Sequence, residues 1–202
     1  MAATPGDYIL FAGPGRVKRD TPLGSTVDDA VITPYIKVAQ DREIHPVLGT
    51  QLYDKIRTLI ADDDIGETTP VDYSDYKTLL DDYIIPCLSF YAFTELAYAL
   101  RLRFSNNSIG IASSEVGQAA SLSDIKPVVD RMESMASFYK ERLIERLVHN
   151  QSLYPEYTTN QNEDMSPTTR NYFQGLNVDP KAPTRNSVKA ILQGLGIEGN
   201  YR

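Results

Sequence analysis

The residues best suited to nucleophilic or acid–base chemistry are few in this sequence. It contains two histidines, His45 and His149, and one cysteine, Cys87. Neither histidine has a second nitrogen or thiol ligand at the spacing of a structural zinc site. Cys87 and His45 would suit a nucleophile and its base, but Cys87 lies in an apolar helical stretch, where burial raises the pKa of a thiol and makes it unreactive. These residues therefore do not support catalysis.

Two short motifs resemble ligand sites and fail on their spacing. The Gly13-Pro14-Gly15 turn lacks the third glycine and the following helix of a dinucleotide fingerprint. Asp62, Asp64 and Gly66 resemble the start of a calcium loop, but the glycine falls one position early and no glutamate stands at the twelfth place. We expect no cofactor, no metal ion and no enzymatic activity.

The net charge of −7 is concentrated in one stretch. From Asp54 to Asp82 there are nine acidic residues and three basic ones. Such a stretch repels nucleic acid at close range, so it disfavours a conventional DNA-reading module. The alternative interpretation is a solvated segment that keeps the protein soluble. The single cysteine excludes an internal disulfide framework and suits a reducing compartment, and no secretory signal opens the chain, so we expect cytosolic synthesis.

Hydrophobic periodicity predicts an all-α fold, a small bundle of about four main helices between residues 26 and 150. The predicted helices cover Val27–Glu43, kinked or restarted at Pro34; Pro46–Asp62, with Gly49 inside; Ser74–Phe104; and Ser123–His149. The chain is expected to turn at Ile44-His45-Pro46 and to pack closely against a neighbouring helix at Gly49. No internal repeat of fixed period is visible.

The third predicted helix is the most apolar, so a membrane span has to be considered. From Tyr83 to Leu100 only Glu95 is charged. The run is barely long enough to span a bilayer, contains Pro86 and has tyrosines along its whole length instead of at its ends. A buried core helix with a kink near Pro86 is therefore the better interpretation, and we expect no membrane association.

The long connection from Ser105 to Ser121 consists mostly of small residues. Loops of this length are uncommon in compact domains and are often functional. Two interpretations stay open, a loop that contacts a partner through residues such as Ile109 and Ile111, and a simple linker.

Both ends of the chain lack hydrophobic periodicity. We expect an N-terminal arm over residues 1–25 and an extended C-terminal arm over residues 151–202, with a short helix at Ser187–Gly194. Arms of this composition bury too little surface to order themselves, so we expect them to become ordered on other molecules. Four aromatic residues in polar surroundings are the predicted partner anchors: Tyr154, Tyr157, Tyr172 and Phe173.

The order of these pieces resembles the head–tail connector, or portal adaptor, proteins of tailed bacteriophages. The resemblance rests on the helix Val27–Glu43, the Ile44–Gly49 segment that leads into Gln51-Leu52-Tyr53, the helix Tyr76–Phe104, and the loop Asn106–Ala120 before the last helix.

The resemblance implies a virion structural protein, made in the host cytoplasm, that forms a homo-oligomeric ring, typically dodecameric, at the head–tail junction. Its partners would be the portal protein and neighbouring tail or ring proteins. Double-stranded DNA would pass through the ring without sequence-specific binding, and Asp62, Asp63 and Asp64 would be candidates to face that channel. The alternative is a soluble helical interaction or regulatory protein that binds a peptide or small ligand in a groove of the bundle.

Overall fold

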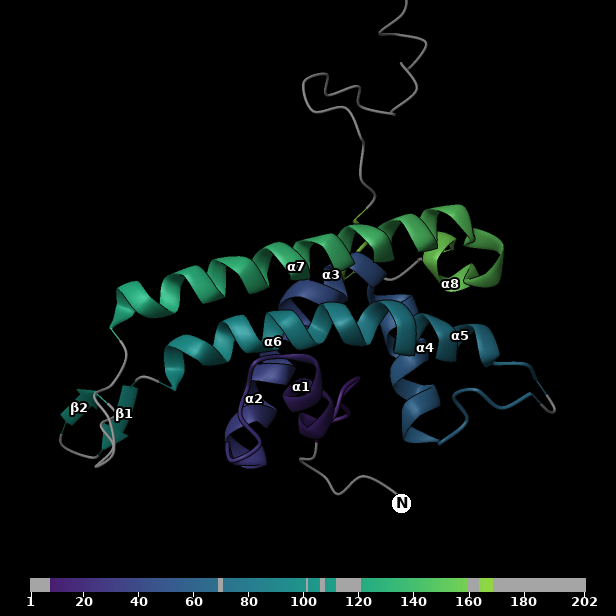
Figure 1. Cartoon of the computed structure of the whole chain (residues 1–202). Helices are drawn as coiled ribbons and strands as arrows, with labels where there is room; N and C mark the ends of the chain where they lie inside the picture. The colour runs from purple at the N-terminus through teal and green to yellow at the C-terminus, as the bar shows by residue number, and fades with distance from the viewer. Residues whose placement is uncertain are drawn as a thin grey trace, which may run out of the picture. The chain divides into compact units, whose positions relative to one another are not determined.

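The computed structural model describes residues 8–68, 71–100, 102–105, 108–111, 121–159 and 164–168, and it confirms a small all-α bundle (Figure 1). The α-helices of these ranges are α1 (Pro14–Asp20), α2 (Asp29–Ala39), α3 (His45–Leu48), α4 (Thr50–Ala61), α5 (Ser74–Leu79), α6 (Ile85–Ala99), α7 (Leu122–His149) and α8 (Pro155–Thr158). Shorter elements are the π-helical turns η1 (Gln40–Ile44) and η2 (Leu80–Ile84), the 3₁₀ turn η3 (Gln151–Leu153) and the strands β1 (Leu102–Ser105) and β2 (Ser108–Ile111).

Helix α6 is the central element of the bundle. It packs against α7 on one side and against α1 and α2 on the other (Figure 1). More than half of its residues are buried, which follows from an apolar sequence that covers most of the helix circumference: Ile85, Cys87, Leu88, Ser89, Phe90, Ala92, Phe93 and Leu96. The predicted core helix is thus confirmed, and in the described part of the chain no helix meets the length and apolarity that crossing a membrane requires.

Pro46 and Pro86 each come shortly after a π-helical turn. His45 N–H donates to the carbonyl of Gln40, and Ile85 N–H donates to that of Leu80, one residue beyond the α-helical partner. A proline inside a helix clashes with the carbonyl four residues earlier and cannot bond to it, and the wider turn accommodates it. The turn predicted at Ile44-His45-Pro46 is therefore wrong, because the helical path continues through Pro46.

The carbonyl that Pro86 leaves without its helical donor is that of Asp82. The Nη1 of Arg142 on α7 approaches this oxygen at 3.4 Å. The π-turn therefore gives α7 a polar contact with the central helix, in addition to the apolar packing between them.

The two π-turns belong to a repeated pattern that the sequence analysis missed. Asp-x-x-Ile-x-Pro occurs at residues 41–46 and again at 81–86. In both copies a lysine four residues before the aspartate forms an ion pair with it, Lys37 with Asp41 and Lys77 with Asp81. The two helix–π–helix segments therefore share one local design, which a search for a repeat of fixed period does not detect because only two copies exist.

Gly49 divides the second predicted helix. Its φ of 73° and ψ of 157° are incompatible with a helix, and they separate α3 from α4. A Cβ at Gly49 would lie 2.6 Å from the ring of Pro167. The predicted helix crossing at Gly49 is therefore wrong, because the backbone packs closely against a non-helical segment, residues 164–168, instead of against a helix.

The third predicted helix also ends earlier than expected, at Ala99. Residues 102–105 and 108–111 pair as the two antiparallel strands of a hairpin, in which Leu102 pairs with Ile111 and Ser105 with Ser108. Asn-Asn stands between the strands in the sequence, and asparagine is favoured in tight hairpin connections. The small-residue connection thus contains secondary structure of its own.

The N-terminal arm predicted for residues 1–25 is wrong from residue 8 onward. Phe11, Val17 and Leu23 are buried in the core. Fully buried Gln40 fastens this segment, because its side chain accepts a hydrogen bond from Phe11 N–H at 2.8 Å and donates to the carbonyl of Ile9 at 3.2 Å. Burying such apolar side chains contributes roughly 1.5–3 kcal/mol each.

The helical core also extends beyond the predicted boundary at residue 150. Helix α8 packs against α4, and residues 164–168, here called the strap, bind along Gly49 and Thr50. The first compact unit of the chain ends at Thr169. The segment that follows, with the predicted helix Ser187–Gly194, lies outside the described residues.

Candidate interaction surfaces

Two of the predicted partner anchors serve the chain's own core. Tyr154 is fully buried, and its hydroxyl donates to the carbonyl of Asp75 at 3.2 Å. Its ring meets the edge of Tyr76 with centroids 5.7 Å apart. Tyr157 is 4% exposed. An aromatic residue in a polar segment does mark an anchor, but here the pocket belongs to the same chain, so the prediction of partner binding is wrong for both.

The structure describes no side-chain contacts for the other predicted anchors. Tyr172 and Phe173 lie outside the described residues. Ile109 and Ile111 belong to β2, opposite Phe104 and Leu102 in the register of the hairpin. Among the described strands no third one joins this sheet. Each strand therefore keeps one edge that no described strand pairs, and a strand edge is a surface that other chains can join.

The acidic residues proposed to face a channel lie at the end of α4. Asp62, Asp63 and Asp64 are all exposed. Asp63 adopts a left-handed φ of 61°, and the N–H groups of Asp63 and Asp64 bond back to the carbonyls of Ile60 and Leu59, the arrangement of a helix-ending Schellman motif. None of the three carboxylates forms an ion pair with another described residue, so they add uncompensated negative charge to the surface.

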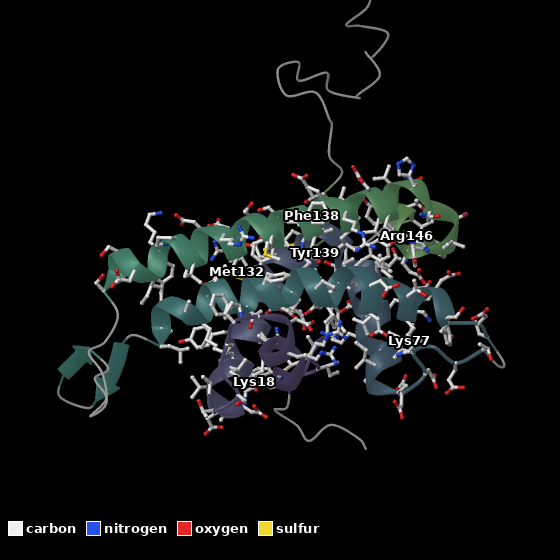
Figure 2. The ribbon with its side chains drawn as sticks, in the orientation of Figure 1. Lys18, Lys77, Met132, Phe138, Tyr139 and Arg146 are labelled. Atoms are coloured by element: carbon white, nitrogen blue, oxygen red, sulfur yellow. The ribbon has the colours of Figure 1, made fainter. Side chains whose placement is uncertain are left out.

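Helix α7 carries the most exposed large apolar side chain of the described residues. Phe138 is 60% exposed, although the same helix buries Met132 and Leu143 against the core. The rings of Phe138 and Tyr139 have their centres 5.4 Å apart, and both residues lie on α7 (Figure 2). Tyr139 in turn stacks on Phe90 of α6, with ring centres 5.6 Å apart. Phe138 is therefore the outer end of an aromatic row that begins in the core.

A groove of about 260 Å³ lies between η1, α6 and α7. Two of its acidic residues are already in ion pairs: Glu95 with Arg42 at 2.5 Å and Glu43 with Lys140 at 2.9 Å. Acidic and aromatic side chains dominate its walls: Arg42, Glu43, Tyr91, Thr94, Glu95, Tyr98, Val129 and Glu133. This combination suits a ligand that is partly apolar and positively charged.

A second hollow of about 260 Å³ lies beside the N-terminal segment. It is lined by Tyr8 of that segment and by Lys37 and Arg57. Tyr53 lies in its wall, and its hydroxyl accepts from Gln40 at 2.8 Å and donates to Asp41 at 3.0 Å. Burial is the main cause that raises the pKa of Tyr53 to about 12. Its hydroxyl is thus neutral and engaged on both sides, which is the state of a structural tyrosine.

One polar cluster superficially resembles a catalytic triad. The hydroxyl of Thr50 lies 2.9 Å from His45 Nε2 and 3.0 Å from Asp164 Oδ2, and it also accepts from Met165 N–H at 3.0 Å. In a triad the histidine stands between the hydroxyl and the carboxylate, whereas here the hydroxyl is in the middle. The hydroxyl of Thr50 has all its hydrogen-bonding positions occupied by these partners. Its role is therefore to hold the strap in place. Sequence reasoning missed this cluster because Thr50 and Asp164 are 114 positions apart.

The predicted inertness of Cys87 agrees with its surroundings. It is fully buried, and its only close polar partner among the described residues is the carbonyl of Ala136 at 3.8 Å. Burial raises the pKa of its thiol to about 12. Across the described ranges, no three histidine, cysteine or carboxylate side chains gather closely enough to hold a metal ion.

A family model matches residues 44–166, described as a family of unknown function, DUF6712. The chain belongs to this family. The matched range starts in η1, contains α3 to α8 and ends inside the strap, so the strap lies at the edge of the shared domain. No curated protein matches the chain, and no solved structure does.

Proposed function

We propose that this protein is a virion structural protein that forms a ring joining the capsid portal to the tail. The supporting observation is the surface of α7. One side of this helix packs against the core, whereas Phe138 on its other side is 60% exposed. Its ring meets Tyr139 edge-on, and Tyr139 stacks on Phe90 of the core. An exposed phenylalanine held in this way is an anchor of the kind that protein interfaces use.

Further support comes from the order of the elements that carry the resemblance to connector proteins. Helix α2, the His45–Gly49 entry, the long central helix, the hairpin and the amphipathic α7 follow one another along the chain. In the proposed ring, α7 of one copy packs against a different face of the next copy, a head-to-tail contact that closes by rotation.

The net charge of residues 1–169 suits a passage for DNA. Residues 170–202 carry five basic and two acidic residues, a net charge of +3, and since the whole chain carries −7, residues 1–169 carry −10. A negatively charged wall holds DNA weakly and lets it slide. The exposed carboxylates of Asp62, Asp63 and Asp64 are the proposed channel-facing groups.

Electron microscopy and native mass spectrometry of the purified protein test the proposal. We expect closed rings in the parent protein. Phe138→Ser removes the apolar anchor and should leave a folded monomer, because an exposed side chain contributes little to the stability of the monomer. Phe138→Tyr keeps the aromatic ring and is the matched control, which should still assemble. Rings that persist in Phe138→Ser would show that α7 is not the interface.

The groove between η1, α6 and α7 favours a second candidate function, a helical interaction protein that binds a peptide or small ligand. The observation that favours it is the combination of acidic and aromatic side chains in the walls of a hollow of about 260 Å³. A monomer that binds such a ligand and never assembles would support this candidate over the ring.

A further inference from the structure

The groove between η1, α6 and α7 carries more negative than positive charge. Its walls hold Glu43, Glu95 and Glu133 against the single base Arg42. Glu95 is paired with Arg42, and Glu43 is paired with Lys140. Glu133 forms no ion pair with another described residue, so it is available to a positively charged ligand.

The groove also offers apolar and aromatic surface. Val129 is 3% exposed and belongs to the floor, whereas Tyr98 is 42% exposed at the rim. Tyr91 already has the ammonium group of Lys140 5.6 Å from its ring centre. A tyrosine face of this kind attracts cations. The groove therefore suits a ligand that is both apolar and basic.

The chain itself contains a segment of that chemistry. From Lys181 to Ile197 the sequence has three basic residues and no acidic one. Its apolar residues recur at intervals of three or four, as on one face of a helix: Val188, Ile191, Leu192 and Leu195. Arg185 and Lys189 are also four positions apart. This is the pattern of an amphipathic peptide that binds a groove through its apolar face.

We infer that residues 181–197 of one copy bind in the groove of a second copy. The apolar face covers Tyr98 and Val129, and Lys189 or Arg185 pairs with Glu133. The inference rests on the proposed ring, which brings copies together. It gives the groove a role in the ring, that of holding neighbouring copies through their C-terminal segments, and it accounts for the opposite charges of that segment and the remaining chain.

Photo-cross-linking of the full-length chain tests the inference. A benzoylphenylalanine replaces Ile191, and ¹⁵N-labelled and unlabelled protein are mixed before illumination. We expect cross-linked peptides that join position 191 to residues 91–98 or 126–133 and that contain both isotopes, which proves that two copies are involved. The inference would be overturned if every cross-link carried a single isotope, if the cross-links lay elsewhere on the chain, or if none formed.

Charge reversal supplies the matched control. Glu133→Lys should lower the yield of the mixed-isotope cross-link about fivefold, the effect of losing an exposed ion pair at the upper end of its usual range, and Lys189→Glu in the same chain should restore it. Glu67→Lys changes the net charge equally at another exposed site and should leave the yield unchanged. Equal losses in Glu133→Lys and Glu67→Lys would mean that only overall charge matters and would refute the groove.

The two proposals fail differently. Rings without the expected cross-links would remove the inference and leave the connector function intact. Protein that neither assembles nor cross-links would contradict both.

Discussion

Gly49 is the position where one methyl group should disturb the most structure. Its φ of 73° with ψ of 157° belongs to a region that residues other than glycine rarely occupy. A Cβ there would also lie 2.6 Å from both Cγ and Cδ of Pro167 and 3.0 Å from its nitrogen. Gly49→Ala must therefore strain the backbone and push the strap away from α4.

The cost has two parts. The strained backbone conformation costs about 1–3 kcal/mol. Moving the strap weakens, among others, the three hydrogen bonds whose donors are backbone N–H groups: from Thr50 N–H to Met165 O, from Met165 N–H to Thr50 Oγ1 and from Thr168 N–H to Pro46 O. Each contributes about 0.5–1.5 kcal/mol. Because the strap can keep some of these bonds after a small shift, we expect the free energy of unfolding to fall by about 2–4 kcal/mol.

Urea denaturation followed by circular dichroism measures this change. Pro167→Ala removes the two ring carbons nearest the new methyl group, so the double variant should recover the part due to the strap and keep the part due to backbone strain. Gly15→Ala in α1 is the control, since nothing lies within 4 Å of its added Cβ and alanine favours a helix. A Gly49→Ala protein as stable as the parent would refute the packing described at the strap.

Three further predictions follow from the buried groups and the domain boundary. Tyr154→Ala should lower the free energy of unfolding by about 3–5 kcal/mol, as for other large buried aromatic residues, and Tyr154→Phe by about 1 kcal/mol through the lost bond to Asp75; a small effect of Tyr154→Ala would restore Tyr154 as a partner anchor. Deleting residues 170–202 should leave the urea transition nearly unchanged, whereas deleting 151–202 should lower its midpoint strongly, and equal transitions would place the boundary at 150 after all. Cys87 keeps its proton in the folded state up to a pH of about 12, whereas the unfolded thiol ionises near its ordinary pKa of 9.0. Its contribution to stability is therefore complete below pH 9 and is lost as the pH rises from about 9 towards 12, which a comparison with Cys87→Ala across that range measures; identical pH profiles would contradict it.

The helices and the central position of α6 could be predicted because their signals are local. An apolar pattern that covers most of a helix circumference requires burial wherever the helix lies. The π-turns could not be predicted in the same way. A proline indicates a break, and only the structure reveals that a wider turn before Pro46 and Pro86 keeps the helical path continuous.

The ends of the chain were wrongly predicted because contacts between residues far apart in the sequence hold them. Phe11, Val17 and Leu23 are buried although they do not recur at helical spacing. The side chain of Gln40 holds the start of this segment through Ile9 and Phe11. Tyr154 was correctly identified as an anchor, but sequence alone does not say whose pocket an anchor fills. The strap depends on contacts between Thr50 and Asp164, which are 114 positions apart, and no local pattern encodes such a pairing.

The mass of the assembled protein tests the central proposal most directly. Native mass spectrometry of the full-length chain, combined with electron micrographs of the same sample, reports whether copies close into a ring. The proposal predicts one discrete oligomer, a whole-number multiple of the 22.6 kDa chain, seen as closed rings. A monomer at every concentration, or open filaments of variable length, would contradict it.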